Sequence, residues 1–445
     1  MQKRKILKPR PISGFPEYTP EIRRVEMRWI DTIRETFERY GYINIETPSV
    51  EEVETLAAKG GDVDKEIYGL QRLNAEDEDD RKPGGPRLAL HFDLTVPTAR
   101  YVAQHFSALT FPFKRYQIQR VWRGERPQEG RFREFLQCDV DVIDQDGISH
   151  DFDAEIPLIA MQTLNAIGAG PIRFMLNNRK ILVGFYQGLG IENAADVIRV
   201  VDKIDKLAAA EIERILIEEN GLSADTAKAC LALAQIRSTD NGFAAEARKL
   251  GVENALFEEG LAELTTVMNR LNAADKGACV AEANLGIARG LDYYTGVVYE
   301  AQLIDYPEYS TICAGGRYAD LVGAYINRDL PGVGISIGLT RLFAKLVKEG
   351  VITGERASPT DVLIARFPDD DVLELDGIAN ALRARGVNVE VYYEAAKLKN
   401  QFRYAERKAI PYLWFAGDRH EVKDLGAGEQ AAADPATWLP ARLKG

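Results

Sequence analysis

Four arginines lie within the short segment RGERPQEGRFREF, residues 123–135, between two runs that are typical of strands. A guanidinium carries a permanent charge and a fork of N–H donors that suits phosphate oxygens. Two glycines in the same turn let the backbone approach a ligand closely. The segment therefore predicts an anion site, with an exposed turn stabilised by ion pairs as the alternative. The residues concerned are Arg123, Arg126, Arg131 and Arg133, the glycines Gly124 and Gly130, and the possible partners Glu125, Glu129 and Glu134.

Two later segments place further cationic groups where an anion could bind. GVGISIGLTRL, residues 332–342, reads as an apolar strand followed by a helix with Arg341 in its first turn, and a helix N-terminus itself favours an anion. ARGLDYYTG, residues 288–296, adds Arg289 and two tyrosines, with a hairpin whose tyrosines are buried as the alternative. Arginines from distant parts of the chain indicate a triphosphate, although no P-loop or G-x-G-x-x-G fingerprint follows a strand.

Polar and apolar side chains alternate along three segments, RLALHFDLTVP (87–97), KRYQIQRVW (114–122) and FLQCDVDVID (135–144). This period of two predicts strands of an antiparallel sheet, each with its polar residues on one face. Three such strands together predict the floor of a binding site. The polar faces carry His91, Asp93 and Thr95 on the first strand, Gln117 and Gln119 on the second, and Gln137, Asp139 and Asp141 with Phe135 on the third.

The distribution of proline divides the chain, because no proline lies between Ile172 and Tyr306. Apolar residues recur there at helical spacing, which predicts a helical insertion. Strand-like segments on both of its flanks, such as GVVYEAQLI (296–304), predict a sheet built from both sides. Towards the C-terminus, strands and helices alternate after a polar linker, which predicts a small parallel α/β domain.

Composition limits the possible partners and compartments. The 445 residues carry a net charge of −12, so a polyanion must be met by local basic patches. The four cysteines are scattered without a C-x-x-C pair, which argues against a zinc site or a disulfide framework. No apolar run approaches the ~20 residues of a membrane span, and the basic N-terminus lacks the apolar core of a signal peptide. We therefore expect a cytoplasmic protein without a membrane partner.

These segments resemble the motifs of class II aminoacyl-tRNA synthetases. YGYINIETPSVEE (40–52) is similar to motif 1, RVWRGERPQEGRFREFLQCDVDV (120–142) to motif 2, and GVGISIGLTRLF (332–343) to motif 3. Within this class, ARGLDYYTG and CAGGRYADL (313–321) are similar to two peptides peculiar to the histidyl group. FDLTVP and VDKIDKL match that group as well, so the resemblance covers nearly the whole chain.

The resemblance implies that L-histidine and ATP, with Mg²⁺, form an adenylate before histidine is transferred to tRNA(His). Arg289 and Arg123 would act in catalysis, with Arg289 between the amino acid carboxylate and the α-phosphate. The implied ATP-binding residues are Arg123, Glu125, Arg131, Phe135 and Arg341. The implied histidine-binding residues are Asp93, Thr95 and Gln137 at the amino group, Asp141 and Tyr294 at the imidazole, and Tyr293 and Tyr318 in the same pocket.

The resemblance also implies a fold. We expect an α+β catalytic domain on a mostly antiparallel sheet, with a helical insertion and a small C-terminal α/β anticodon-binding domain. The family forms homodimers through motif 1, and tRNA would meet the hairpin and the basic segment KLKNQFRYAERK (397–408). In that segment Lys399, Arg403, Arg407 and Lys408 would face the anticodon stem, with the solvated face of an ordinary amphipathic helix as the alternative. The expected boundaries are 1–174 and 275–350 for the catalytic core, 175–274 for the insertion, 351–357 for the linker and 358–445 for the anticodon-binding domain.

Two alternatives stay open. One is a catalytically inactive paralogue that serves as a regulatory subunit of ATP phosphoribosyltransferase, which lacks the anticodon-binding domain and has usually lost the histidyl peptides. The other is a class II ligase for a different amino acid, which the histidyl peptides disfavour. The chain also departs from the family at His91, where arginine is common, and at Thr340, where glutamate is frequent.

Overall fold

The computed structural model describes residues 7–57, 66–71, 87–204, 207–288, 294–319, 323, 325–326 and 328–443. It divides into two compact units. The first consists of Met1–Pro16 and Trp29–Glu349, and the second of Glu17–Arg28 and Gly350–Gly445, so helix α1 (Pro20–Arg39) contributes to both. The segments on both sides of the expected insertion therefore lie in the same unit.

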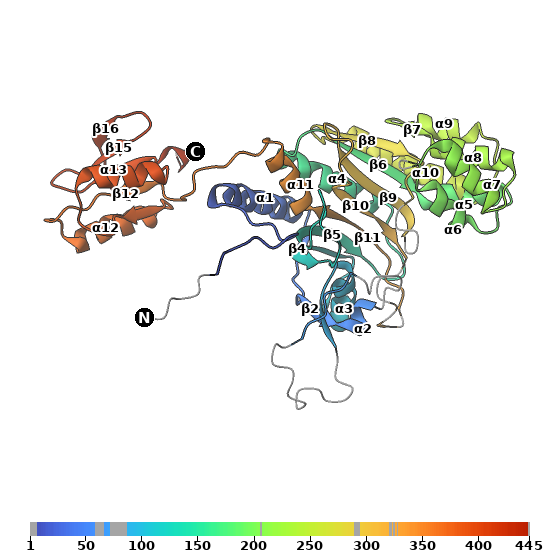
Figure 1. The fold of residues 1–445 in the computed structure, drawn as a ribbon, viewed down its shortest axis with the longest axis horizontal. Helices are drawn as coiled ribbons and strands as arrows, with labels where there is room; N and C mark the ends of the chain where they lie inside the picture. Colours follow the sequence, from blue (N-terminus) through green and yellow to red (C-terminus); the bar gives the residue numbers. More distant parts are fainter. Residues whose placement is uncertain are drawn as a thin grey trace, which may run out of the picture. The chain divides into compact units, whose positions relative to one another are not determined.

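Nine of the described strands form one sheet in the first unit, in the order β1-β4-β5-β11-β10-β9-β6-β8-β7 (Figure 1). Neighbours run antiparallel except for the pairs β1 with β4 and β6 with β8. The mostly antiparallel sheet built from both flanks of the insertion is thus confirmed. The strands are β1 (Ile43–Asn44), β4 (Phe113–Trp122), β5 (Glu134–Ile143), β6 (Ile172–Asn178), β7 (Arg237–Ser238), β8 (Cys279–Asn284), β9 (Tyr294–Leu303), β10 (Cys313–Tyr318) and β11 (Gly332–Gly338).

The polar residues of β4 and β5, the second and third strands of this sheet, lie opposite one another. The register pairs Arg115 with Asp141, Gln117 with Asp139, and Gln119 with Gln137. Most of these polar side chains are buried, as are the apolar residues of the other face. The alternation that predicts one core face and one polar face is confirmed for both strands, but the polar face is enclosed within the protein.

The first of the three predicted strands is wrong for most of its length. Only Leu88–Leu90 forms a strand, β3, which pairs with β2 (Val50–Glu52) in a separate two-stranded sheet. Helix α3 (Thr95–His105) begins soon afterwards, because the Asp93 carboxylate accepts a hydrogen bond from the Val96 backbone N–H at 3.0 Å. A proline in the first helical turn fits this start. Asp93 and Thr95 therefore come from a helix N-terminus and not from a strand.

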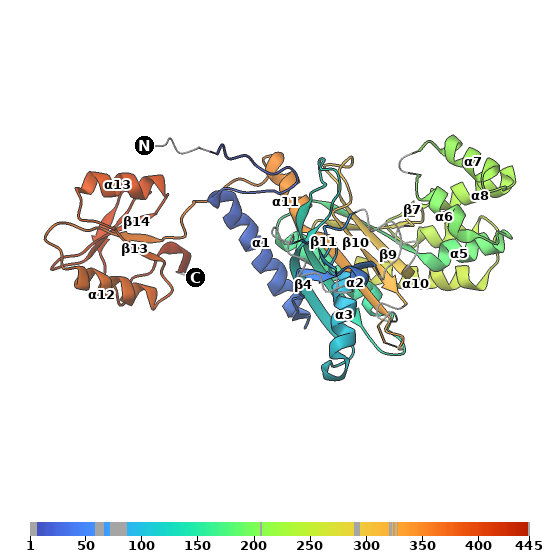
Figure 2. The ribbon, with the colours of Figure 1, turned by 60° about the horizontal axis from the view of Figure 1, so that its bottom comes forward.

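Helices pack against the large sheet, and a group of further helices lies beside one of its edges. Helix α4 (Phe152–Ala166) packs against β11, and α11 (Leu339–Lys348) against β5. The chain between β6 and β8 forms mainly helices, which gather beside β7 and β8 in both ribbon views (Figure 2). These helices are α5 (Arg179–Gly188), α6 (Ala194–Val201), α7 (Ala209–Glu218), α8 (Ala224–Ala234), α9 (Gly242–Arg248) and α10 (Ala255–Ala273); α2 (Val53–Ala57) and the 3₁₀ turn η3 (Phe106–Ala108) flank α3.

Glycines bring two of these helices close together. A Cβ at Gly184 of α5 would lie 2.3 Å from the Phe257 backbone nitrogen, and one at Gly260 of α10 would lie 2.7 Å from that of Ile181. Only glycine permits such an approach. The tight α5–α10 pair thus packs together the first and the last helix of the expected helical insertion.

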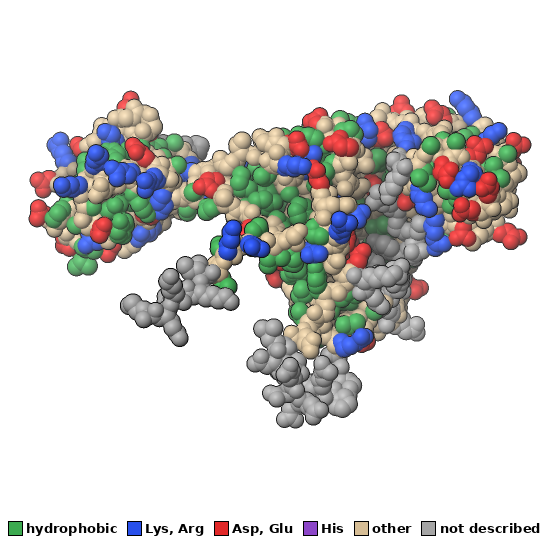
Figure 3. Space-filling view, viewed as in Figure 1, with side chains coloured by type: hydrophobic (Ala, Val, Ile, Leu, Met, Phe, Trp, Pro, Cys, Tyr) green, Lys and Arg blue, Asp and Glu red, His purple; other side chains and the backbone are tan. Residues whose placement is uncertain are grey.

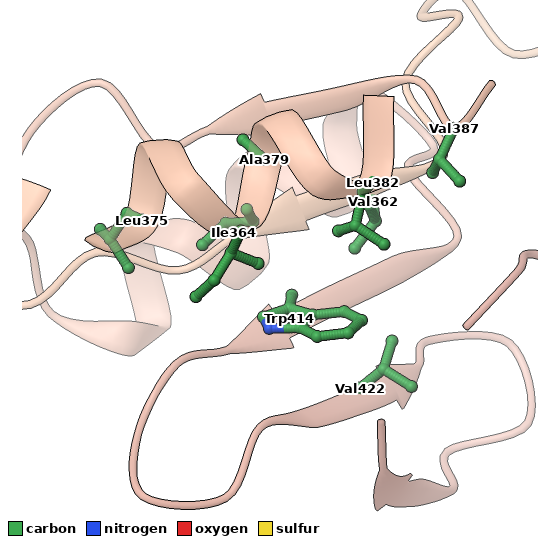
Figure 4. Packing of buried hydrophobic residues seen from close by; sticks show 9 residues of the cluster. Val362, Ile364, Leu375, Ala379, Leu382, Val387, Trp414 and Val422 are labelled. Carbon is green, nitrogen blue, oxygen red and sulfur yellow. The ribbon is translucent and has the colours of Figure 1, made fainter. Parts of the chain in front are cut away.

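The second unit carries its own sheet, in the order β13-β12-β14-β15-β16 among the described strands. Its first three strands are parallel, as predicted, and β15 and β16 add two strands that pair antiparallel. Residues of the sheet and of α12 form an apolar core around Trp414 (Figure 4). The elements are β12 (Val362–Ile364), α12 (Val372–Arg383), β13 (Val389–Val391), α13 (Leu398–Arg407), β14 (Tyr412–Phe415), β15 (Glu421–Asp424), β16 (Gln430–Ala432) and η4 (Ala441–Leu443).

Candidate active site

The turn between β4 and β5 and the start of α11 enclose a cavity of about 180 Å³. All five predicted nucleotide-binding residues line it, and so does Gln137, which was predicted at the amino acid. A second, larger cavity of about 810 Å³ adjoins it and shares four of these five residues. The structure therefore brings the two predicted arginine segments together. The five residues are Arg123, Glu125, Arg131, Phe135 and Arg341.

Hydrogen bonds hold Arg341 at the mouth of this cavity. Its Nε donates to the Gly130 carbonyl at 2.6 Å, and its Nη1 donates to the Thr311 carbonyl at 2.6 Å. Gly130 has a φ of +74°, and a Cβ there would lie 3.1 Å from the Tyr309 ring. The glycine of the predicted anion turn is thus needed for its backbone conformation and for the packing of Tyr309.

The other cationic groups of the cavity lie around Glu125. Its carboxylate is 3.5 Å from Nη1 of Arg131 and 3.9 Å from Nη1 of Arg123. The Arg123 guanidinium also lies over the Phe135 ring, 5.1 Å from its centroid. The ring of Phe135, a predicted ATP-binding residue, is therefore covered by an arginine on one side.

The electrostatics of the cavity favour an anion. Burial lowers the pKa of Arg341, and the positive charges of Arg123 and Arg131 lower it further, while Glu125 opposes them. In the smaller cavity, three guanidinium groups therefore face one carboxylate among the lining residues, that of Glu125. An added phosphate would relieve their mutual repulsion.

Asp141 lies at the centre of the predicted imidazole pocket. Its Oδ2 is 2.6 Å from Nη2 of Arg115, and its Oδ1 accepts a hydrogen bond from the Tyr318 hydroxyl at 3.3 Å. Burial raises the pKa of Asp141, whereas Arg115 and the Tyr318 hydroxyl lower it. The carboxylate is therefore held by one cation and one hydroxyl in a region from which water is excluded.

Two glycines of β11 make room for these side chains. A Cβ at Gly334 would lie 1.8 Å from Oδ1 of Asp141, and one at Gly332 would lie 2.3 Å from the hydroxyl oxygen of Tyr318. The register places both glycines next to the pocket residues. The two glycines of the segment GVG (332–334) therefore leave the space that the side chains of Asp141 and Tyr318 occupy.

Tyr294 and Asp93 approach the same region from other elements. Tyr294 begins β9 opposite Tyr318 of β10, and a Cβ at Gly316 would lie 2.9 Å from its ring. Asp93 is buried, and its charge raises the pKa of Asp139 on β5. Thr95 is half-buried at the first position of α3. Two predicted residues, Arg289 and Tyr293, lie outside the described residues.

Asp139 is a buried carboxylate that had no predicted role. Burial raises its pKa to about 7, because the positive charge of Arg115 and the polar hydroxyl of Ser336 offset only part of the cost. With Asp93 and Asp141 it gives three buried carboxylates, whereas Arg115 is the one cation among the described residues that lowers the pKa of Asp139. This excess of negative charge favours a cationic ligand group.

Sequence reasoning missed Arg115, Ser336 and the carbonyl of Thr311. The signal for Arg115 was its parity with Gln117 and Gln119 along β4. The contact of Thr311 with Arg341 joins residues 30 positions apart and has no local signal. The two departures from the family have structural partners. His91 is buried with Nε2 2.7 Å from the Arg120 carbonyl, and the Thr340 hydroxyl accepts from the Leu136 backbone N–H at 2.8 Å.

An antiparallel sheet that carries an arginine-rich hairpin and a helix N-terminus with a further arginine is the architecture of a class II aminoacyl-tRNA synthetase. A family model described as "Histidyl-tRNA synthetase" matches residues 14–342, and one described as "Anticodon binding domain" matches residues 362–430. The chain belongs to the histidyl-tRNA synthetase family.

Individual relatives agree with this assignment. The chain is 55% identical to a histidine–tRNA ligase of Thermobifida fusca (strain YX), over 98% of this chain and 100% of that protein. It is 47% identical to a histidine–tRNA ligase of Micrococcus luteus, with 96% of each covered. The crystal structure of histidyl-tRNA synthetase from Nostoc sp. PCC 7120 superposes with a TM-score of 0.84 at 36% identity, and covers 96% of this chain and 97% of that one.

Proposed function

We propose that this chain activates L-histidine with ATP, releases pyrophosphate, and transfers histidine from the adenylate to the 3′ end of tRNA(His). As a member of its family it is an aminoacyl-tRNA ligase. The observation that carries the proposal is the meeting of a guanidinium-lined cavity with a carboxylate pocket on one face of the sheet. A triphosphate and a small cationic amino acid are the ligands that these two sites suit.

The arginines would bind the nucleotide phosphates. Arg123 and Arg341 converge on the smaller cavity from different elements, with Glu125, Arg131 and Phe135 beside them. Preorganised cations stabilise the negative charge that develops when the histidine carboxylate attacks the α-phosphorus. We assign Arg123 and Arg289 to this step, with Arg289 holding the two reacting anions together.

The carboxylate pocket would recognise histidine. Asp141, with Tyr294 and Tyr318 beside it, would accept a hydrogen bond from the imidazole N–H, and Tyr293 would complete the pocket. An analogue that lacks this donor would lose its hydrogen bond to the buried Asp141, which supports selectivity. Asp93, Thr95 and Gln137 would bind the α-ammonium group. The local excess of negative charge supports this assignment.

The carboxylates of the larger cavity fit a Mg²⁺ ion that arrives with ATP. Mg²⁺ is commonly held by one or two carboxylates together with substrate phosphates, and Glu125 and Glu300 both line this cavity. Within the described ranges, no group of three or more potential metal ligands is present. We therefore propose that Glu125 and Glu300 would hold the ion, which neutralises phosphate charge when bound.

The second unit would bind the anticodon end of tRNA. Lysine and arginine side chains gather over α13 (Figure 3). Lys399, Arg403 and Arg407 are exposed, whereas Lys408 pairs with Glu390 at 2.6 Å. Three of the four predicted cations are thus available for phosphates of the anticodon stem. The tip of the hairpin, residues 126–130, would meet the acceptor end.

Assembly and organisation follow the family. We propose a homodimer through motif 1, because Ile43 lies on the edge strand β1 with 55% of its surface exposed. We also propose a cytoplasmic enzyme. Within the described residues, none of the helices has the length and apolar character to cross a membrane. The division into core (1–174 and 275–350), insertion (175–274), linker (351–357) and anticodon-binding domain (358–445) is proposed on the same basis.

The regulatory paralogue is less supported than the ligase. A family model for an anticodon-binding domain matches this chain, and the relatives at 47% and 55% identity are named as ligases over nearly their full length. The structure of a regulatory subunit or synthetase from Bacillus halodurans shares the fold at 21% identity, which does not distinguish the two functions.

ATP–pyrophosphate exchange with each of the twenty amino acids tests this proposal. We expect exchange with L-histidine alone, followed by charging of tRNA(His) and of no other tRNA. Exchange with no amino acid by a folded chain would favour the regulatory paralogue. Exchange with a different amino acid would show that the pocket has been assigned to the wrong substrate.

A further inference from the structure

Arg317 belongs to the segment CAGGRYADL, and the proposed function gives it no role. It is a buried residue near the end of β10, and its side chain reaches the start of α4. Its Nε and Nη2 donate to the two carboxylate oxygens of Asp153 at 2.8 and 3.0 Å. Its Nη1 and Nη2 also donate to the carbonyls of Ile148 and Ser149, at 3.1 and 2.9 Å. Four hydrogen bonds therefore hold this guanidinium in place.

Asp153 connects two neighbouring strands of the sheet to α4. Its buried carboxylate accepts from Arg317 of β10, and its backbone carbonyl accepts from the Tyr299 hydroxyl of β9 at 2.9 Å. A bidentate pair is geometrically specific, because the guanidinium fork matches the two carboxylate oxygens. The start of α4 thus determines where β9 and β10 lie at this level of the sheet.

The pairing of β9 with β10 is irregular beside Arg317. Gly316 pairs with Val298, but Tyr318 pairs with Tyr294, so three residues of β9 face one residue of β10 between these pairs. Such a bulge bends the strand and re-aims its side chains. A regular register would place a glycine opposite Tyr318 and would carry Tyr294 two residues further along. The bulge therefore brings together the two tyrosines that are predicted to line the imidazole pocket.

Arg317 and Gly296 fit together at this bulge. A Cβ at Gly296 would lie 2.8 Å from Cδ of Arg317 and 3.4 Å from its Cβ and Cγ. The stem of the arginine thus occupies the space that a side chain at position 296 would need. Because Asp153 holds the far end of this stem, Arg317 cannot move aside without losing hydrogen bonds. The bulge in β9 is therefore packed against a side chain whose position α4 fixes.

We propose that Arg317 and Asp153 are positioning residues for histidine recognition, because their buried pair fixes the bulge in β9 and thereby holds Tyr294 opposite Tyr318. The Tyr318 hydroxyl in turn donates to Asp141 at 3.3 Å. This inference rests on the proposed function, in which both tyrosines line the imidazole pocket. Neither Arg317 nor Asp153 would contact the substrate itself.

Three substitutions disturb this arrangement in different ways. Arg317→Lys keeps the charge but loses the guanidinium fork, and Asp153→Asn keeps the shape but loses the charge. Gly296→Ala leaves both partners in place and adds a methyl group at the bulge. Arg270→Ala is the matched control, because Arg270 of α10 is exposed and binds the start of α4 through the Asp151 carboxylate at 2.7 Å.

Each variant is assayed by ATP–pyrophosphate exchange below its unfolding transition, with L-histidine and ATP varied in turn. A misplacement of about 1 Å can cost on the order of 10²-fold, so we expect KM for L-histidine to rise about 10-fold in the three variants. KM for ATP should change less than about twofold, because binding of the other substrate is not disturbed. The double variant of Arg317→Lys with Asp153→Asn should be no worse than either single one, since the two residues act as a pair.

The two KM values separate positioning from general damage. A merely structural role would reduce the folded fraction, which lowers the maximal exchange rate and leaves both KM values unchanged. That result, or an equal rise in both KM values, would overturn the inference, as would an effect of Arg270→Ala as large as that of Arg317→Lys. If the two pair variants do not fold, Gly296→Ala decides alone. A folded wild-type chain that shows no exchange with L-histidine would instead overturn the proposed function.

Discussion

The two sheets of this protein bury opposite kinds of side chain. In the C-terminal unit, Val362, Ile364 and Trp414 are fully buried against α12 (Figure 4). In the first unit, Arg115 and Asp139 are buried almost as completely, at 0% and 4% exposure, on the neighbouring strands β4 and β5. Apolar burial contributes about 25 cal/mol per Å², whereas a buried charge costs free energy unless it is paired.

This difference indicates where each sheet has been shaped by function. The C-terminal sheet has an ordinary apolar buried face, and the function that we propose for this unit uses the exposed cations of α13. In the first sheet, buried charged residues take the place of part of the apolar core, and the ligands that we propose would complete their set of partners. Substitutions in the C-terminal sheet should therefore change mainly stability, whereas substitutions in the first sheet should change mainly ligand binding and catalysis.

The largest expected effect concerns the apolar core of the second unit. Trp414→Ala should lower the free energy of unfolding of this unit by about 3–5 kcal/mol, because it leaves a large cavity. ATP–pyrophosphate exchange should change less than about twofold, since every residue assigned to that reaction lies in the first unit, while tRNA charging should fall. Calorimetry and both assays check this, with the exposed Leu373→Ala on α12 as control. Loss of exchange would show that the two units are not separable.

The next effect concerns the arginines of the first unit. Arg341→Ala should reduce the exchange rate by about 10²–10³-fold, the usual cost of removing one group that stabilises transition-state charge. Arg341→Lys should lie between the variant and wild type, because it keeps the charge but not the guanidinium fork. Arg173→Ala, on β6 with a half-exposed side chain, serves as control. A decrease below about fivefold would remove Arg341 from the phosphate site.

A smaller effect should appear in stability as a function of pH. The pKa of Asp139 is raised from 3.8 to about 7, so the folded state binds a proton that the unfolded state has lost between these values. The free energy of unfolding should therefore fall as pH rises from about 4 to 7 and level off above. Asp139→Asn should raise the melting temperature at pH 8 by about 2 °C, the shift that roughly 1 kcal/mol produces in a large domain, and should have little effect at pH 4.5.

An exposed carboxylate of the same unit provides the comparison for this measurement. Asp31→Asn, on α1, should change the melting temperature equally little at both pH values. If Asp139→Asn is no more stable than wild type at pH 8, the neighbours of this carboxylate fully compensate the free-energy cost of its burial. A more stable variant that binds histidine more weakly would instead show that the first sheet exchanges stability for recognition.

Much of the site could be predicted from the sequence, because strand parity depends only on local alternation. Phe135, Gln137, Asp139 and Asp141 share a face as that rule requires. The same rule failed at RLALHFDLTVP, where the side chain of Asp93 begins a helix within an alternating pattern. A helix start and a strand compete there, and tertiary packing decides between them.

The remainder of the site depends on contacts across the sheet. The pair of Arg115 with Asp141 requires the register of β4 and β5, and the bond from Gln137 to Ser336 joins residues 199 positions apart. The sequence contains these residues but not their proximity. The role of Gly334 could likewise not be foreseen, because it depends on a carboxylate from the neighbouring strand.

The most direct test of the central claim is a calorimetric titration of L-histidine into wild type and Asp141→Asn at pH 8, where the free imidazole is neutral. Loss of a buried carboxylate that accepts a hydrogen bond should weaken binding by about 10–100-fold, while ATP binding and the melting transition of the second unit stay unchanged. Equal affinity of the two proteins for L-histidine would contradict the assignment of this buried polar face as the histidine site.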